Sequence, residues 1–305
     1  MSRVRVGTSG WSYPSGEGTW NGIFYPEKKS KTFDELGFYA EHFDTVEVNS
    51  SFYRVPAIKT TQDWVKRTPA RFEFSLKLFQ KFTHPDMFLK ATGKDPADLD
   101  RKDVDEFRAA IEPIAAAGKL GALLAQFPAS FKDGLSSRDY LADLLRAFSG
   151  YPVAVELRHR SWSDGIGDTL ALLNAFGAAL VQIDEPKFRF SIRQNYLPNV
   201  LGFYYMRLHG RNAEKWWRHE KSEERYDYLY SAGELKEFSD TADAAKRLVR
   251  KLYLYTNNHF SAKSVANAAM IKQQLGEPIE GEYSPEFIER YPELAGALTP
   301  SRTFF

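Results

Sequence analysis

Short strand-like runs alternate with helix-like segments along this chain, and that alternation limits its possible folds more than any other feature. Eight runs rich in β-branched and aromatic residues are predicted strands, at 3–9, 45–50, 72–79, 120–127, 152–159, 178–184, 203–210 and 253–259. Amphipathic segments that follow them are predicted helices, at 32–43, 60–69, 103–119, 136–148, 167–176, 240–252 and 261–276. Strands that alternate with helices form a parallel sheet through right-handed crossovers. Eight such units predict a single closed (β/α)8 barrel of the TIM type.

The alternative arrangement of the same units is an open, doubly wound sheet. A dinucleotide-binding sheet of that kind needs glycines at a fixed spacing after its first strand, and the segment GTSGW lacks this spacing. No linker-like segment divides the chain, so we predict one domain over 1–305. The last part, 277–305, contains four prolines and is predicted to pack on the outside of the barrel as irregular structure and short helical turns.

The composition excludes several classes of function. The 305 residues are 43% hydrophobic, which suffices for a large core, and they carry a formal net charge of +1. This balance argues against a positive field over the whole surface of the kind that nucleic acids attract. The chain has no cysteine, so it has no disulfide, no thiolate metal ligand and no cysteine nucleophile. No stretch has the length and apolarity of a membrane span, and we expect a soluble cytoplasmic protein without a membrane partner.

The segments that follow the predicted strands differ in length. Long ones follow strands 1, 3, 6 and 7, at 10–31, 80–102, 185–202 and 211–239. The segments that enter strands are mostly short. In TIM barrels the active site lies at the carboxyl ends of the strands and is built from the loops there. The long loops therefore predict which face of the barrel carries a functional site.

Polar residues interrupt the predicted strands near their carboxyl ends, although strands of a parallel barrel are buried on both faces. Taking every second residue places these polar side chains on the inner face, at Glu47, Asn49, Lys77, Gln126, Glu156, Arg158, Asp184, Arg207, His209 and Asn257. One interpretation is a buried ion-pair network that only stabilises the barrel, because three carboxylates face three cations. The other is a functional site, since polar groups from most strands converge on one end of the barrel.

The functional interpretation assigns chemistry by side-chain type. We predict that Glu47 or Glu156 is the general acid or base, with His209 as a further proton carrier. The three cations would hold a carboxylate or phosphate of the substrate, and the neighbouring carboxylates are expected to keep Lys77 charged. The other predicted substrate-binding residues are amides, one carboxylate and two loop aromatics, namely Asn49, Gln126, Asn257, Asp184, Trp11 and Tyr53. Two glutamates across the barrel mouth would also suit glycoside hydrolysis.

Two other functions would use these residues differently. A metal ion for isomerase or phosphoesterase chemistry would need the ligands Glu47, Glu156, Asp184 and His209. No HExxH-like spacing supports that site and three cations compete for the carboxylates, so we predict no metal and no other cofactor. The loop at 211–239 would be the surface for RNA or a protein partner, but its acidic residues nearly balance its basic ones, which disfavours nucleic acid. The leading prediction is a metal-independent enzyme for a small polar, anionic or sugar-like molecule; the sequence does not indicate an oligomeric state.

Several motifs occur in an order that is typical of one protein family. They are GTSGWSYPSGEGTWNGIFYP, FDTVEVNSSFYRVP, FEFSLKLFQKFTH, LGALLAQFPASF, AVELRHRSW, YYMRLHG and LYTNNHF. Together they closely resemble the domain of unknown function 72 family, also called YecE-like, from about the first strand to the last helix. The resemblance implies a TIM-type barrel, and it implies no established reaction.

Overall fold

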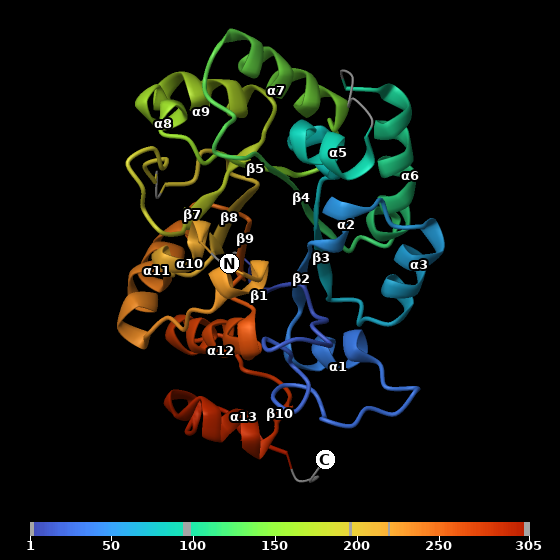
Figure 1. Cartoon of the computed structure of the whole chain (residues 1–305), viewed down its shortest axis with the longest axis vertical. Coiled ribbons are helices and arrows are strands. Elements are labelled where there is room, and N and C mark those ends of the chain that lie inside the picture. The colour runs from blue at the N-terminus through green and yellow to red at the C-terminus, as the bar shows by residue number, and fades with distance from the viewer. Residues whose placement is uncertain (1–2, 94–98, 195–196, 219, 302–305) are drawn as a thin grey trace.

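Nine parallel strands form a ring in the computed structural model, which describes residues 3–93, 99–194, 197–218 and 220–301 (Figure 1). They are β1 Arg3–Ser9, β2 Thr45–Val48, β3 Glu73–Lys77, β4 Leu120–Gln126, β5 Val153–Glu156, β6 Ala179–Leu180, β7 Gln182–Asp184, β8 Phe203–Leu208 and β9 Lys251–Thr256. Their order is β6-β5-β4-β3-β2-β1-β9-β8-β7. β6 pairs with β5 and β7 pairs with β8, so the single stretch that contains both, interrupted at Val181, closes the ring. The predicted barrel of the TIM type is confirmed.

Helices cover the outside of the ring (Figure 1). The longer ones are α1 Glu35–His42, α3 Ile58–Lys66, α5 Pro85–Thr92, α6 Arg101–Ala116, α7 Leu135–Ala147, α9 Ile166–Ala175, α11 Ala232–Ala245 and α12 Lys263–Leu275. Shorter ones lie in loops and in the tail, and they are α2 Ser50–Tyr53, α4 Gln80–Thr83, α8 Ser161–Asp164, α10 Ala213–Trp217 and α13 Pro285–Arg290. Six of the seven predicted helices agree with the observed ones to within about three residues at each end, which is the usual uncertainty of a helix boundary.

The seventh predicted helix, 240–252, is wrong in its position. α11 begins at Ala232, because Ser231 forms a capping box with Glu234. The Glu234 carboxylate accepts a hydrogen bond from the Ser231 backbone N–H at 2.9 Å, and the Ser231 hydroxyl accepts one from the Glu234 N–H at 3.3 Å. Such a box fixes the start of a helix, and its Ser-x-x-Glu spacing is visible in the sequence. The last predicted helical residues instead begin strand β9.

Apolar side chains fill the barrel in two layers. The larger layer lies between the strands and the helices and takes alternate strand residues, such as Val46, Leu76, Val155, Leu180, Met206 and Leu254. The smaller layer lies inside the ring and takes the intervening residues, among them Leu124, Ala154, Val181, Ile183, Tyr205, Tyr253 and Tyr255. Because side chains alternate along a strand, the next inner positions toward the carboxyl ends carry the polar residues that the sequence singles out.

The long loops and the tail contain ordered elements of their own. The loop after β3 holds α4 and α5, and the loop after β8 holds α10 and a 3-10 turn at Ser222–Tyr226. In the tail, β10 Glu282–Tyr283 pairs with β11 Thr299–Pro300, and Phe287 of α13 is buried. Parts of three predicted loops, at 94–98, 195–196 and 219, and the predicted tail beyond 301 lie outside the described residues. None of the described helices is long and apolar enough to cross a membrane.

Candidate functional site

Arg207 lies at the centre of the inner polar residues and joins two strands on opposite sides of β8. Its side chain is 1% exposed. Nε donates to Oε2 of Glu47 at 2.9 Å and Nη2 donates to Oε1 of the same carboxylate at 2.7 Å. Nη1 donates to Oε2 of Glu156, which comes from β5. These bonds occupy the guanidinium on both sides, so Arg207 organises the barrel interior and does not offer a free fork to a substrate.

Glu47 is the most completely partnered carboxylate of the group. Besides Arg207, it accepts a hydrogen bond from the Ser9 hydroxyl at 2.7 Å and one from the Tyr205 hydroxyl at 2.7 Å. Its side chain has no exposed surface. These donors replace the water shell that burial removes from the carboxylate. The structure thus supports the network interpretation for Glu47, and the general-base role remains a prediction without geometric support.

Glu156 is held ionised by two arginines. Arg158 Nε donates to its Oε1 at 2.8 Å, and Arg207 binds its other oxygen. Burial alone would raise the pKa of Glu156, but the two guanidinium groups outweigh burial and hold that pKa well below its usual range. A carboxylate with so low a pKa is a weak base near neutral pH. Glu156 therefore suits a positioning role for Arg158.

Arg158 extends the network toward solvent. Its side chain is 17% exposed, and Nη1 lies 3.2 Å from Oε2 of Glu185. Burial raises the pKa of Glu185 even though Arg158 opposes that rise. Glu185 is not among the residues predicted from the sequence, because the predicted strand ended at Asp184. The alternation of Val181 and Ile183 inside the ring continues to Glu185, so strand parity alone could have found it.

Asp184 lies on the other face of the strand, and the prediction that it belongs to the inner set is wrong. Its carboxylate accepts a hydrogen bond from the Tyr230 hydroxyl at 2.7 Å and two from Arg211, at 2.8 and 3.0 Å. The Arg211 guanidinium in turn lies over the ring of Phe238 in α11. Asp184 therefore joins the strand to the helix layer and has a structural role.

Lys77 differs from the other cations of the inner face. Its Nζ lies 3.8 Å from the centre of the Phe52 ring, and among the described residues it has neither an ion pair nor a hydrogen-bond acceptor. Burial lowers the pKa of Lys77 to about 7, and the positive charge of Arg207 adds to that effect. The expectation that Glu47 and Glu156 keep Lys77 charged is wrong, because burial and the positive charge of Arg207 outweigh the two carboxylates, which still raise the pKa of Lys77.

His209 is buried beside Arg207 and is neutral near pH 7. Burial, together with the positive charge of Arg207, lowers the pKa of His209 to about 3. Nδ1 lies 2.9 Å from the amide nitrogen of Asn257, and Nε2 lies 3.6 Å from Oε1 of Glu156. Gln126 also belongs to this group, since its amide oxygen lies 3.3 Å from Arg207 Nη1. The structure thus brings together His209, Asn257 and Gln126 as predicted.

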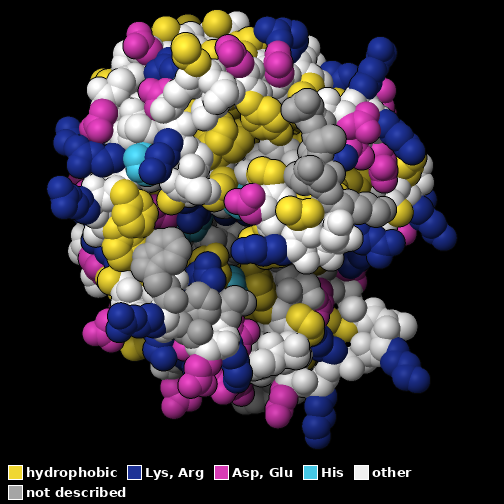
Figure 2. Space-filling view, turned by 45° about the horizontal axis from the view of Figure 1, so that its top comes forward, with side chains coloured by type: hydrophobic (Ala, Val, Ile, Leu, Met, Phe, Trp, Pro, Cys, Tyr) yellow, Lys and Arg dark blue, Asp and Glu magenta, His cyan; other side chains and the backbone are white. Residues whose placement is uncertain are grey.

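Aromatic side chains from three loops lie above the polar residues. The Tyr13 ring stacks on the His259 ring with centres 4.2 Å apart, and Tyr226 contacts the same imidazole at 5.0 Å. Trp216 lies 6.4 Å from the His209 ring. One face of the molecule is hollowed near its centre, with Lys or Arg and His side chains inside the hollow (Figure 2). The sequence analysis did not select these aromatic residues, because loops lack the periodicity that fixes the direction of a side chain.

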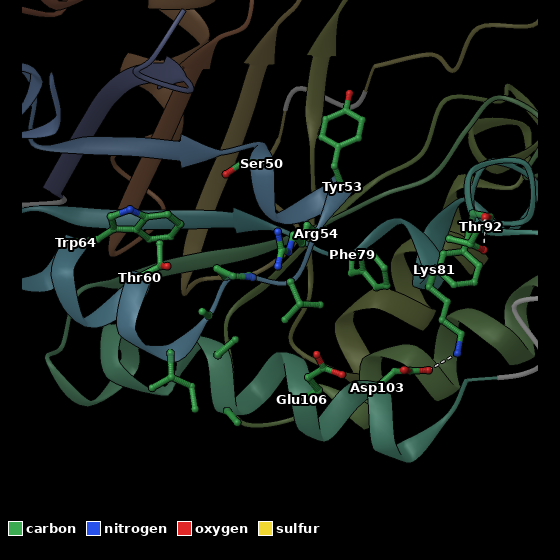
Figure 3. A pocket seen from close by; sticks show the side chains of 17 residues that line it. Ser50, Tyr53, Arg54, Thr60, Trp64, Phe79, Lys81, Thr92, Asp103 and Glu106 are labelled. Carbon is green, nitrogen blue, oxygen red and sulfur yellow. Dashed lines mark hydrogen bonds and ion pairs between the residues drawn. The ribbon is translucent and has the colours of Figure 1, made fainter. Parts of the chain in front are cut away.

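The loop residues that the sequence did select lie elsewhere. Trp11 packs edge-on against Trp64 of α3, with ring centres 5.5 Å apart. Tyr53 is 67% exposed at the end of α2. It lines the edge of a separate pocket of about 960 Å³ between α2, α3, α5 and α6. Its ring points away from the other labelled side chains of that pocket (Figure 3). Asn49 precedes α2, and its buried amide oxygen has no partner among the described residues. None of these three residues joins the network around Arg207.

The site contains no obvious metal-binding group. Among the described residues, no three His, Asp or Glu side chains are grouped so that they could hold a metal ion. Glu47 and Glu156 each face Arg207, and Asp184 lies on the opposite side of its strand. The ligand set that the sequence offered as an alternative is thus divided between two faces of the barrel wall.

A parallel barrel with a buried carboxylate–guanidinium network at the carboxyl ends of its strands places this chain in the class of TIM-barrel proteins. More specifically, it belongs to the family described as "Protein of unknown function DUF72", whose model matches residues 5–289. It is 27% identical over 292 residues to the UPF0759 protein YunF of Bacillus subtilis (strain 168), covering 92% of this chain and 96% of YunF. The family resemblance found in the sequence motifs is confirmed.

Solved structures of the same family have the same fold. A DUF72 family protein from Thermotoga maritima MSB8 is 34% identical, with a TM-score of 0.75 over 90% of this chain and 100% of that one. A DUF72 family protein from Enterococcus faecalis V583 is 23% identical, with a TM-score of 0.76 over 90% and 95% of the two chains. These relatives bear family names that define no reaction, so a proposal about function depends on the site itself.

Proposed function

We propose that this protein is an enzyme that acts on a small anionic or sugar-like metabolite at the mouth of the barrel, without a metal, with Lys77 as the proton carrier. The observation that carries this proposal is the position of Lys77 Nζ, which lies over Phe52 and lacks an acceptor among the described residues. With its pKa lowered to about 7, this amine is partly neutral at physiological pH. A neutral amine can accept a proton from a substrate or attack a carbonyl carbon.

The residues around Lys77 suit a polar substrate. Arg158 reaches solvent and can bind a carboxylate or phosphate while Glu156 and Glu185 fix its orientation. Burial lowers the pKa of Lys77 and raises the pKa of Glu185. Opposite shifts of this kind are typical of a base and an acid that act as a pair. Gln126 adds an amide that can hold a hydroxyl group or a developing oxyanion.

The two alternative functions have less support. Metal-dependent isomerase or phosphoesterase chemistry needs carboxylates that are free to bind a cation, whereas Arg207 binds both Glu47 and Glu156, and Arg158 also binds Glu156. A nucleic-acid surface on the loop after β8 needs an excess of positive charge, whereas Lys215 and Lys221 in that loop pair with glutamates.

A metabolite screen tests the proposal. The wild-type protein is incubated with a defined mixture of sugar phosphates, sugar acids and keto acids, with EDTA present, and conversion is followed by mass spectrometry and NMR. We expect one component to be converted by the wild type, and Lys77→Met to slow that conversion by about 10²-fold or more, the usual contribution of a positioned acid–base group. The control Lys81→Met, which breaks an ion pair with Asp103 away from the network, should retain the activity. Conversion at the wild-type rate by Lys77→Met, or its absence in the wild type, would contradict the proposal.

A further inference from the structure

A second, basic pocket lies beside the mouth of the barrel, formed by Arg160 from the segment after β5 and by the loop after β7. Its volume is about 390 Å³. The side chains that line it include four cations and no carboxylate, and the cations are Arg160, Lys187, Arg189 and Arg193. A pocket of this size is large enough for a phosphate group together with part of the molecule that carries it.

The backbone connects this basic pocket directly to the proposed site. The Ile192 N–H donates to the Arg158 carbonyl oxygen at 2.9 Å, and the Arg160 N–H donates to the Phe190 carbonyl oxygen at 2.8 Å. The loop after β7 thus runs alongside the residues that follow β5. Arg158, whose side chain binds Glu156, and Arg160, which lines the basic pocket, are separated by a single residue. The basic pocket and the proposed site are therefore neighbours along this segment, although the Arg158 side chain does not itself line the pocket.

The loop after β7, which carries three of the four cations, has a defined shape. The Ser191 N–H donates to the Phe188 carbonyl oxygen at 3.0 Å, and the Ser191 hydroxyl accepts a hydrogen bond from the Phe188 N–H at 2.9 Å. Further along, the Gln194 side chain accepts a hydrogen bond from the Ile183 N–H of β7 at 2.8 Å. These bonds close a turn and tie it to the barrel, so the cations on it need little rearrangement to meet a ligand.

The positive charge of the pocket is only partly compensated. Arg160 and Arg193 share one carboxylate, Asp164, at 3.1 and 4.0 Å. Lys187 and Arg189 have neither an ion pair nor a side-chain hydrogen bond within the part of the chain that the structure describes. Four cations thus face one carboxylate, and the excess charge is confined to a pocket instead of following a long surface stripe. That distribution favours a compact anion over a nucleic-acid backbone.

We infer that the basic pocket binds the phosphate group of a small phosphorylated metabolite. A phosphate monoester carries nearly two negative charges at neutral pH and presents three acceptor oxygens, which suit the donors of the three arginines and the lysine of the pocket. Phosphate binding would narrow the substrate class of the proposed function to phosphorylated molecules. That the bound molecule is a substrate rests on the proposed function. In that arrangement the phosphate lies in the basic pocket, and the rest of the molecule extends past Arg158 toward Lys77.

Calorimetric titration at constant ionic strength tests this inference, with inorganic phosphate, glucose 6-phosphate, glucose and a ten-residue oligothymidylate as probes. The double variant Lys187→Gln/Arg189→Gln should bind both phosphates at least about tenfold more weakly than the wild type, because it loses charge-assisted hydrogen bonds. The control double variant Lys59→Gln/Lys66→Gln removes the same charge from exposed positions on α3 and should bind normally. Glucose should not bind measurably.

Several outcomes would overturn the inference. They are the absence of saturable phosphate binding by the wild type, equal weakening in both double variants, and oligothymidylate binding that is tighter than glucose 6-phosphate binding and falls steeply with salt. The variant Lys77→Met separates the two proposals, since it should bind phosphate normally even though it has lost turnover. Phosphate binding that depends on Lys187 and Arg189 would support the pocket even if the metabolite screen found no turnover. Turnover that depends on Lys77 but not on Lys187 and Arg189 would contradict phosphate binding in the basic pocket and leave the proposed function in place.

Discussion

Replacing Arg207 by leucine is expected to lower the free energy of unfolding by about 3–5 kcal/mol, because removing one partner of a buried ion pair leaves its charge uncompensated. In the wild type the guanidinium lies between Glu47 and Glu156, and neither carboxylate has exposed surface. Leucine donates no hydrogen bond, so two buried anions would remain in the barrel without their shared cation. Urea unfolding at pH 7, followed by circular dichroism, measures the change.

Two further variants show whether uncompensated charge is the cause. Adding Glu47→Gln and Glu156→Gln to Arg207→Leu removes both anions and should recover part of the lost stability. Arg189→Leu serves as the matched control, since that side chain is exposed and has no ion pair among the described residues, and it should unfold like the wild type. An unfolding midpoint of Arg207→Leu at the same urea concentration as that of the wild type would mean that the network contributes little to the stability of the fold.

The stability of the protein should also depend on pH through Lys77. Its pKa falls from 10.5 in a model peptide to about 7 in the folded protein. The unfolded chain therefore binds more protons than the folded protein between these two values, and folding becomes more favourable as the pH rises through this window. Relative to Lys77→Met, the wild type should gain about 4 kcal/mol of stability between pH 7 and pH 10.

Urea unfolding of both proteins at several pH values measures this difference, and other titrating groups cancel in the comparison. Lys59→Met is a suitable control, because Lys59 is exposed on α3, and it should follow the wild-type curve. Below pH 7, where Lys77 is charged and buried, Lys77→Met should be at least as stable as the wild type. Parallel curves of stability against pH for the wild type and Lys77→Met would show that folding does not change the pKa of Lys77.

Strand periodicity predicted most of the barrel and much of its polar interior. Alternation along parallel strands placed Glu47, Lys77, Glu156 and Arg207 on the inner face, and the structure agrees. The error at Asp184 arose because the predicted strand ended at that residue, whereas the alternation of Val181 and Ile183 pointed to Glu185. The start of α11 was also available from the sequence, in the capping box of Ser231.

Other properties of the site depend on distances that no sequence pattern contains. Whether Arg207 is a substrate ligand or part of the fold depends on how many of its donors are used, and here both carboxylates bind it. The protonation state of Lys77 depends on how far burial outweighs the two carboxylates that raise its pKa, and no sequence pattern contains that balance. The contacts of Tyr13 and Tyr226 with the His259 ring depend on loop conformation, and loops have no regular sequence period from which side-chain directions can be predicted.

The proposed function depends above all on Lys77 being an amine that loses its proton near neutral pH at the mouth of the barrel. Titration of the lysine side-chain signals by NMR in uniformly 13C- and 15N-labelled protein tests it directly, with the Lys77 signal assigned by its absence from Lys77→Met. We predict a titration midpoint of about 7 for Lys77, well below the value of about 10.4 that is usual for a lysine in water. A midpoint for Lys77 close to that of the exposed lysines, in the folded protein, would contradict the account.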